Sequence, residues 1–303
     1  MSKELIEFSN ALALATERSA ASVVAIHTET RGSSSGIVWR PGVIVTSEHA
    51  LRRDEEIQLT LPNGRVAPAT LVGRDPSTDI AVLKCAEPDT AVPLFGDAAA
   101  LKPGSLTLVV GRTRASGPVA ALGVVSLVAP DRRTWMGASL TPYIRLDIGL
   151  QPTSIGGAVI DASGSIVGLA TPRFARFGAI AVPTSAINKI ADALLKQGRI
   201  PRGYLGVGLQ PVRLPNILRE MLQRNEKTAA IVLEVHPDGP ADKAGIVIGD
   251  ILVSLGGQSI TRLEDVQSLI GDAIGKTLPL KFVRGGTVQE GTIVVVERPH
   301  EGE

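Results

Sequence analysis

The segment Asp147–Thr171 restricts the fold of this chain more than any other part of the sequence. A glycine pair, Gly156-Gly157, is followed by an apolar segment (158–160), a tight Asp-Ala-Ser-Gly sequence and a second apolar segment (166–170). Aspartate and glycine between two short apolar runs predict a β-hairpin. Paired glycines directly before a strand indicate backbone that bends sharply or approaches another segment closely. A buried hairpin that begins in a crowded loop is therefore expected here.

The composition indicates a globular chain and excludes several classes of function. The 303 residues are enough for two domains, and aromatic residues make up only 3%, so aliphatic side chains must fill the cores. The net charge is +1 with acids and bases interspersed, which predicts no binding to nucleic acid. The single Cys85 excludes an internal disulfide framework and a cysteine-rich zinc site. No spacing among the four histidines predicts a metal site, and no cofactor is expected.

The N-terminal residues predict a helix and, with the hydropathy pattern, a cellular location. No apolar run reaches the roughly 18–20 residues that span a bilayer, so no membrane span is expected. Leu5, Phe8, Leu12 and Ala15 recur at helical spacing, whereas acidic residues interrupt any continuous apolar core of a signal peptide. The prediction is a cytoplasmic protein, or an extracytoplasmic one if a leader preceding this sequence has been removed.

The rest of the chain alternates short apolar segments with turn residues. Val23–Thr28 and Ile80–Cys85 are typical strands, and the small residues 31–36 predict a loop. This pattern favours β-barrels or sandwiches over a doubly wound sheet. Apolar residues at helical spacing before Gly198 predict a helix, and Pro201 follows at a plausible domain boundary.

The glycine pair and its hairpin resemble the nucleophile loop of chymotrypsin-like serine proteases. Their pattern Gly-Asn/Asp-Ser-Gly-Gly falls without gaps on residues 153–157. Residues 44–51, which contain His49, and 72–84, which contain Asp79, resemble the histidine and aspartate segments of such enzymes. The resemblance implies that His49 is the general base and that Asp79 orients it.

The last hundred residues resemble a PDZ domain. The signature begins with Tyr204-Leu205-Gly206-Val207 and continues with Gly-Pro-Ala-Asp-Lys-Ala-Gly and Gly-Asp-Ile-Leu-Val-Ser-Leu. PDZ domains bind an extended peptide C-terminus as an added strand. The resemblance implies that residues 204–207 bind the carboxylate and that Val266 and Ile270, on a helix over 263–270, line the opposite wall. Peptide C-termini or unfolded proteins are the expected partners.

Together the two parts resemble the HtrA (Deg) family of serine proteases, from about Ala11 to about Arg298. The resemblance implies a mainly β fold, a double β-barrel of chymotrypsin type followed by an α+β PDZ domain. The expected divisions are an N-terminal segment (1–20), a protease domain (21–199), a PDZ domain (200–298) and a tail (299–303). HtrA proteins are usually trimers or multiples of trimers, so a homo-oligomer is expected, and a purely structural oligomeric platform is one possible role.

The sequence departs from this family at the residues that matter most for catalysis. Ile155 occupies the nucleophile position and Thr153 replaces the glycine of the oxyanion loop, whereas Gly156 and Gly157 match the family pattern. The main prediction is therefore a pseudoprotease that binds peptides or unfolded segments as a scaffold, regulator or chaperone-like module. The alternative is an active serine-type endopeptidase that uses Ser154 with His49 and Asp79. Whether the chain is an enzyme stays open at this point, with the substitutions favouring an inactive protein.

Overall fold

The computed structural model describes residues 3–28, 32–51, 56–86, 91–130, 132–134, 138–271 and 273–299. The chain forms two compact units, Met1–Ile200 and Pro201–Glu303. The mainly β architecture confirms the predicted fold class. Apart from Pro299, the predicted tail 299–303, with His300, lies outside the described residues.

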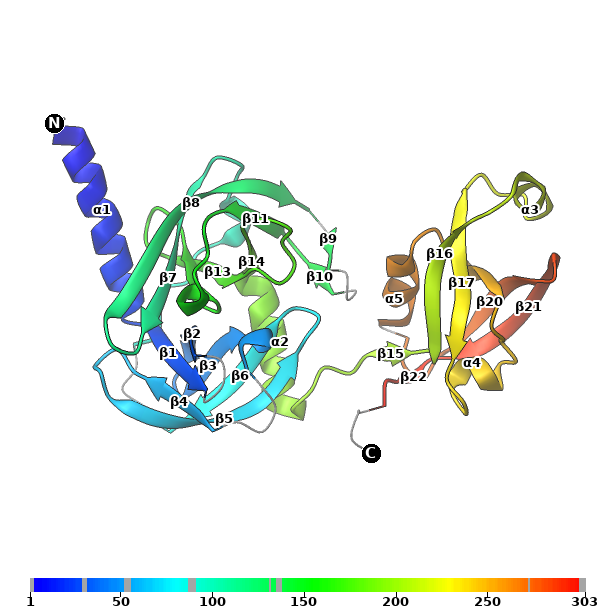
Figure 1. The fold of residues 1–303 in the computed structure, drawn as a ribbon, viewed down its shortest axis with the longest axis horizontal. Helices are drawn as coiled ribbons and strands as arrows, with labels where there is room; N and C mark the ends of the chain where they lie inside the picture. Colours follow the sequence, from blue (N-terminus) through cyan, green and yellow to red (C-terminus); the bar gives the residue numbers. More distant parts are fainter. Residues whose placement is uncertain are drawn as a thin grey trace. The chain divides into compact units, whose positions relative to one another are not determined.

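The first unit contains two closed antiparallel barrels, each of six strands (Figure 1). The first barrel has the order β1-β2-β3-β6-β5-β4 and the second β11-β14-β13-β12-β7-β8. The strands of the first are β1 (Val23–Thr28), β2 (Gly32–Arg40), β3 (Val43–Ser47), β4 (Ile57–Thr60), β5 (Val66–Asp75) and β6 (Ile80–Cys85). Those of the second are β7 (Leu106–Thr113), β8 (Gly117–Ala129), β11 (Tyr143–Asp147), β12 (Ala158–Ile160), β13 (Ile166–Thr171) and β14 (Ala179–Pro183). The small strands β9 (Arg132–Arg133) and β10 (Ser139–Leu140) pair with each other.

One local expectation about the first barrel was wrong. The small residues after Arg31 form the start of β2 and not a loop, because they pair in register with β1 from Val23↔Ile37 to Thr28↔Gly32. Small side chains signal a loop only when no neighbouring strand provides hydrogen bonds, and the preceding strand β1 provides them here. Ser35 is fully buried and bonds to the backbone of Thr153 and Ile155.

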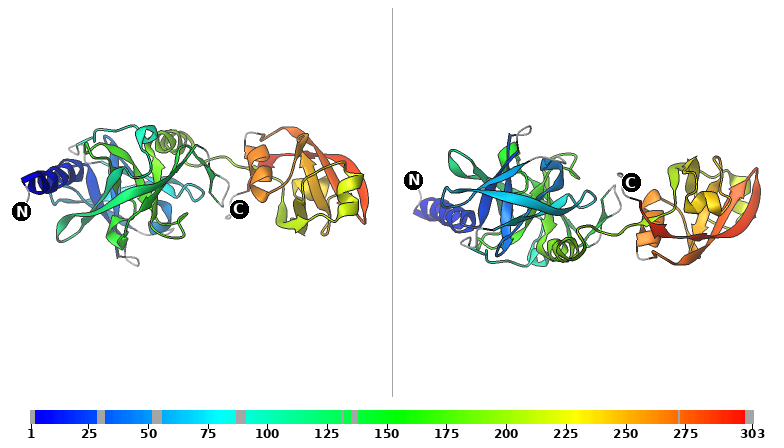
Figure 2. Two further views of the ribbon diagram at one scale, coloured as in Figure 1. Left: turned by 90° about the horizontal axis from the view of Figure 1, so that it is seen from above. Right: turned by 90° about the horizontal axis from the view of Figure 1, so that it is seen from below.

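Helices and short 3₁₀ segments complete the first unit. They are α1 (Lys3–Ala20), η1 (Glu48–Ala50), η2 (Ala98–Ala100), η3 (Pro152–Ser154) and α2 (Thr184–Gln197). The first turns of α1 extend away from the barrels in every view (Figures 1 and 2), and its buried residues are confined to its C-terminal part. Helix α2 ends at Gly198 in the left-handed conformation, as its sequence predicts.

A buried cation fixes α1 and the two barrels together. The Arg112 guanidinium on β7 donates from Nε to the Val23 carbonyl (2.6 Å) and from Nη2 to the Ala20 carbonyl at the end of α1 (2.7 Å). Burial lowers the pKa of Arg112, because the charged form loses hydration. The interface beneath is a hydrophobic cluster drawn from both barrels and α2, including Val45, Val110 and Ile187. The two halves of the protease-like unit are thus one packed body around the site between them.

The second unit is built on one antiparallel sheet with the order β16-β17-β18-β20-β21 (Figure 1). The strands of this sheet are β16 (Val207–Arg213), β17 (Thr228–Val235), β18 (Ile251–Leu255), β20 (Thr277–Arg284) and β21 (Thr287–Val294), with β19 (Gln258–Ser259) paired to β18. Strands β15 (Gly203–Tyr204) and β22 (Val296–Glu297) pair with each other. Its helices are α3 (Asn216–Met221), α4 (Pro240–Lys243) and α5 (Leu263–Gly271). Apolar residues of the sheet and α5 form one core, in which Leu205, Val232 and Phe282 are buried.

Two features of the described residues bear on possible partners. No helix described here combines the length and the apolar character needed to cross a membrane. Within the described ranges, no three His, Cys, Asp or Glu side chains gather as a metal site would require.

Candidate active site and peptide-binding edge

His49 and Asp79 come together although they are far apart in the sequence. His49 lies in η1 directly after β3, and Asp79 precedes β6, which pairs with β3. The His49 Nδ1 atom lies 2.9 Å from Asp79 Oδ1 and 2.8 Å from Oδ2, and the His49 backbone N–H donates to Oδ1 at 2.9 Å. This is the base-and-carboxylate arrangement of a serine protease, in which the carboxylate fixes the imidazole tautomer.

The Asp79 carboxylate is fully buried and saturated with donors. Its Oδ2 accepts hydrogen bonds from the hydroxyls of Ser47 and Thr171, the latter at 2.5 Å. Burial by itself would raise the pKa of Asp79, but the hydrogen bond and charge of His49, together with the two hydroxyls, outweigh it and lower that pKa. Asp79 also has a φ of 60°, a backbone conformation that aspartate tolerates better than most residues. The carboxylate therefore stays ionised beside His49.

The nucleophile loop forms a 3₁₀ turn that consumes its own N–H groups. In η3 the Ser154 N–H donates to the Gln151 carbonyl (2.9 Å), and the Ile155 N–H donates to the Pro152 carbonyl (3.2 Å). In a serine protease, the N–H of the nucleophile residue is an oxyanion donor and must point at the substrate. In this turn the Ile155 N–H cannot serve as such a donor, because the Pro152 carbonyl oxygen accepts it. Ile155 itself is half-buried and has no group that can attack a carbonyl.

Contacts from the first barrel and β7 hold this turn in place. The Ser35 hydroxyl donates to the Thr153 carbonyl at 2.6 Å and accepts from the Arg112 N–H at 2.8 Å. The Ser35 N–H donates to the Ile155 carbonyl at 2.8 Å. Since the loop is bonded at Thr153 and at Ile155, sliding it by one residue would break both contacts.

The glycine pair is required by close backbone approach. Gly156 has a φ of 77°, and a Cβ there would lie 2.3 Å from the Ser35 carbonyl oxygen. A Cβ on Gly157 would lie 2.5 Å from the Val110 carbonyl oxygen. The packing of this loop therefore requires glycine at both positions.

Ser154, the predicted alternative nucleophile, lies at the end of η3 and is only 3% exposed. Its Cα would be 2.8 Å from a Cβ placed on Gly111, so the residue packs directly on β7. The structure thus brings His49 and Asp79 together and places Thr153, Ser154 and Ile155 in one turn whose backbone is tied to both barrels.

Sequence reasoning missed an ion-pair cluster beside His49. Glu48 is buried and pairs with Arg74 of β5 (3.4 Å) and with Arg173 after β13 (3.1 Å). Arg173 Nη1 also lies 3.8 Å from Asp79 Oδ1, and the Arg173 N–H donates to the Thr171 hydroxyl. The cluster joins the two barrels at the rim of the dyad. Nothing local in the sequence could reveal it, because its members come from three distant segments.

The loop Tyr204–Val207 in the second unit directs N–H groups to one side. The Leu205 carbonyl accepts from the Ala241 N–H (2.8 Å), and the Gly206 carbonyl accepts from the His236 N–H (2.9 Å). Because a trans peptide is planar with its C=O and N–H opposed, the N–H groups of Gly206 and Val207 point the other way. Two adjacent N–H groups that point to the same side can both donate hydrogen bonds to a carboxylate.

The α5 residues that were predicted to line the peptide site belong mainly to the core. Val266 is 3% exposed and Ile270 9% exposed, and both pack with Leu205. A Cβ on Gly203 would lie 2.0 Å from the Ile270 carbonyl oxygen, so the chain runs tightly beneath the end of α5. Val207 is half-buried at the beginning of β16.

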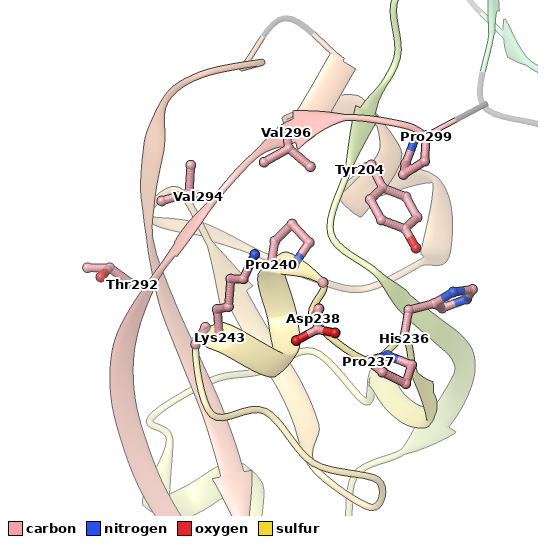
Figure 3. A pocket seen from close by; sticks show the side chains of 12 residues that line it. Tyr204, His236, Pro237, Asp238, Pro240, Lys243, Thr292, Val294, Val296 and Pro299 are labelled. Atoms are coloured by element: carbon pink, nitrogen blue, oxygen red, sulfur yellow. The ribbon is translucent and has the colours of Figure 1, made fainter. Parts of the chain in front are cut away.

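A pocket of about 660 Å³ lies beside this loop, and Tyr204, His236 and Pro240 are among the residues that line it. Tyr204, Lys243 and Val296 border it from three different elements (Figure 3). Of the predicted peptide-binding residues, all within the described chain, Tyr204 alone lines it. The pocket shown in Figure 3 therefore shares Tyr204, and no other of these residues, with the predicted peptide-binding site.

Comparisons with known proteins match both units. A family model described as a trypsin-like peptidase domain matches residues 34–169, and a PDZ domain model matches residues 231–284. Proteins named probable periplasmic serine endoprotease DegP-like are similar, with 31% identity in Pseudomonas savastanoi pv. phaseolicola and 30% in Halomonas elongata. These alignments cover 91% and 90% of this chain and 58% of each relative. The chain thus spans well under two thirds of the relatives' length.

Solved structures share the fold across nearly the whole chain. The serine endoprotease from Yersinia pestis has 26% identity and a TM-score of 0.75, with coverage of 95% of this chain and 98% of that one. The HtrA-type protease AlgW with decapeptide has 24% identity and a TM-score of 0.76, with coverage of 97% and 99%.

Fold, dyad and comparisons together define a chymotrypsin-like protease domain joined to a PDZ domain. The chain belongs to the HtrA family of serine proteases, as the sequence motifs predicted. The prediction of a cytoplasmic location was wrong, since the matched relatives are named as periplasmic enzymes. The error arose because the prediction relied on the first residues of this sequence, which carry no information about what precedes them.

Proposed function

We propose that this HtrA-family chain binds peptides through its PDZ domain and does not cleave them. The observation that carries the proposal is the nucleophile loop, in which Ile155 replaces serine and its N–H donates to the Pro152 carbonyl. Loss of the nucleophile removes covalent catalysis, and the consumed N–H removes oxyanion stabilisation. Thr153 supports the same conclusion, because a β-branched residue disfavours the positive-φ backbone that a glycine permits there.

A second candidate is an active serine endopeptidase that uses Ser154. Two observations favour it: the His49–Asp79 dyad is fully assembled, and the matched relatives are named serine endoproteases. For this candidate, the loop would have to rearrange so that the Ser154 hydroxyl reaches His49. That rearrangement would break the contacts of Ser35 with Thr153 and Ile155, which is why we rank it second.

Proteolysis of casein and labelling with a fluorophosphonate probe separate the two candidates. The proteins to compare are wild type, Ser154→Ala and His49→Ala, with a trypsin sample as positive control for the probe. The pseudoprotease proposal expects no cleavage and no labelling in any of the three. Cleavage by wild type that both substitutions abolish, with the label attached to Ser154, would establish the endopeptidase instead.

The relatives and the PDZ domain also suggest where and on what the protein acts. We propose an extracytoplasmic location, on the basis of the relatives' names, and peptide C-termini or unfolded chains as partners. Fractionation of cells that express the full natural gene checks the location. Fluorescence anisotropy with peptides that carry a free or an amidated C-terminus checks the partner, because only the free carboxylate should bind at residues 204–207.

We also propose a homo-oligomer that forms through α1. Leu5, Ile6, Phe8 and Leu14 are each more than 40% exposed on this helix, which leaves an apolar surface without a partner in the described chain. Light scattering after gel filtration should show a mass of several chains in wild type and a smaller one in Phe8→Asp. A single-chain mass for wild type would refute the proposal.

A further inference from the structure

Strand β16 is an edge of the PDZ sheet, and its hydrogen-bonding sides can be assigned residue by residue. Within the described residues, β16 pairs only with β17. The Gly206 carbonyl bonds to His236 beside β17, so the Val207 N–H faces away from β17. N–H groups alternate sides along a strand, so Leu209 and residue 211 share the orientation of Val207.

A second observation gives the same assignment independently. Val232 of β17 stands opposite Leu209, and its N–H and C=O bond to Asp250 and Gly249 on the far side of β17. Val232 therefore makes no ladder bond to Leu209, and Leu209 must face outward. Two residues further on, Pro211 stands opposite Ala230, which has the same orientation as Val232. Position 211 also faces outward.

Residue 211 is a proline, which has no N–H. A proline on the free side of an edge strand leaves the ladder to β17 intact, which explains why β16 tolerates it. An incoming strand meets outward N–H groups at Val207 and Leu209 and none at Pro211. Pro211 is also exposed, so its ring is accessible to a bound chain.

We infer that Pro211 limits the bound peptide to a short β-pairing. This inference rests on the proposed peptide binding and specifies which part of a ligand is recognised. With the carboxylate at residues 204–207, an antiparallel peptide places its third-last residue opposite Leu209 and its fifth-last residue opposite Pro211. The backbone carbonyl of that fifth-last residue finds no donor. Pairing with β16 therefore stabilises only the last three or four residues of a bound peptide. Residues further upstream add little binding free energy through strand pairing.

Peptide affinity as a function of length tests this inference. The probes are the best-bound member of a seven-residue library with free C-termini and its three-residue truncation, both with acetylated N-termini. The variants are Pro211→Val, which restores the outward N–H, and Gln210→Val, a matched control in the same strand whose N–H faces β17. Dissociation constants come from anisotropy competition with the full chain, and circular dichroism verifies the fold of each variant.

In Pro211→Val, one restored hydrogen bond should tighten binding of the seven-residue peptide by about five-fold and leave the three-residue peptide unchanged. Gln210→Val should show the wild-type ratio for the two peptides. An equal gain in both variants would mean that strand propensity is responsible, and an unchanged ratio in Pro211→Val would also overturn the inference. If no library member binds any form of the protein, the proposed peptide binding itself fails, which is a different result from an unchanged ratio.

Discussion

Substitution of Ile155 by serine alone should not restore protease activity to the level of a family enzyme. Ile155→Ser returns a hydroxyl to the position at which the family motif has its serine, and the His49–Asp79 dyad is already assembled. The N–H of residue 155 would still donate to the Pro152 carbonyl, as it does in the native turn. A second substitution, Thr153→Gly, should let the peptide between residues 152 and 153 rotate, because glycine accepts backbone conformations that a β-branched residue does not.

The size of the effect follows from the oxyanion hole. Removal of one oxyanion donor costs about 100- to 1,000-fold in kcat, or about 2.7–4 kcal/mol of transition-state stabilisation. The bond that competes for the donor is 3.2 Å long and worth about 0.5–1.5 kcal/mol, so it can be broken once the backbone is free to rotate. We therefore expect Ile155→Ser to be at least about 100-fold less active than the double variant.

The assay is the initial rate of casein cleavage by wild type, each single variant and the double variant. Thr153→Gly alone should be silent, because it lacks a nucleophile. Addition of His49→Ala to the double variant should abolish its cleavage and thereby exclude a contaminating protease. Equal activity of Ile155→Ser and the double variant would refute the reasoning, since the Pro152 carbonyl would then be no obstacle. If the double variant also fails to cleave casein, the loss of function extends beyond this loop.

Three further predictions concern the free energy of unfolding, which urea titration measures. Arg112→Leu should destabilise the protein by about 2–4 kcal/mol, because two buried carbonyl oxygens lose their donors; an effect under about 0.5 kcal/mol would contradict this. Gly156→Ala should lower the free energy of unfolding by about 2–5 kcal/mol, because the new Cβ strains the backbone and overlaps its neighbours. Gly64→Ala should lower it by only about 1–2 kcal/mol, because Gly64 has a similar φ but open space around its Cβ. Equal losses in the two variants would contradict the argument that crowding matters at Gly156. Because the pKa of Asp79 is lowered in the folded state, its carboxylate stabilises the fold above the unfolded pKa of about 4, and that contribution is lost as the pH falls through the lower folded pKa. The difference in unfolding free energy between wild type and Asp79→Asn should then be largest near pH 6 and shrink below about pH 4, and a difference that is independent of pH would rule out this linkage.

Local patterns were sufficient for most of the secondary structure. The strands predicted at Val23–Thr28 and Ile80–Cys85 have those bounds in the structure, because alternation and turn residues act over a few positions. The prediction failed at residues 32–36, where pairing with β1 places small polar residues in a strand. It also gave no sign of the Glu48–Arg173 ion pair, whose members come from different barrels.

The sequence by itself determined that this is an HtrA-family chain, since residue identity at a motif needs no coordinates, and it predicted that Ile155 stands at the nucleophile position. Only the tertiary structure decided where the N–H groups point. The Ile155 N–H turns to Pro152, and the side of β16 on which Pro211 lacks a donor follows from its pairing with β17. Residue types fix which donors exist, but long-range strand pairing fixes their direction, and both binding and catalysis depend on direction.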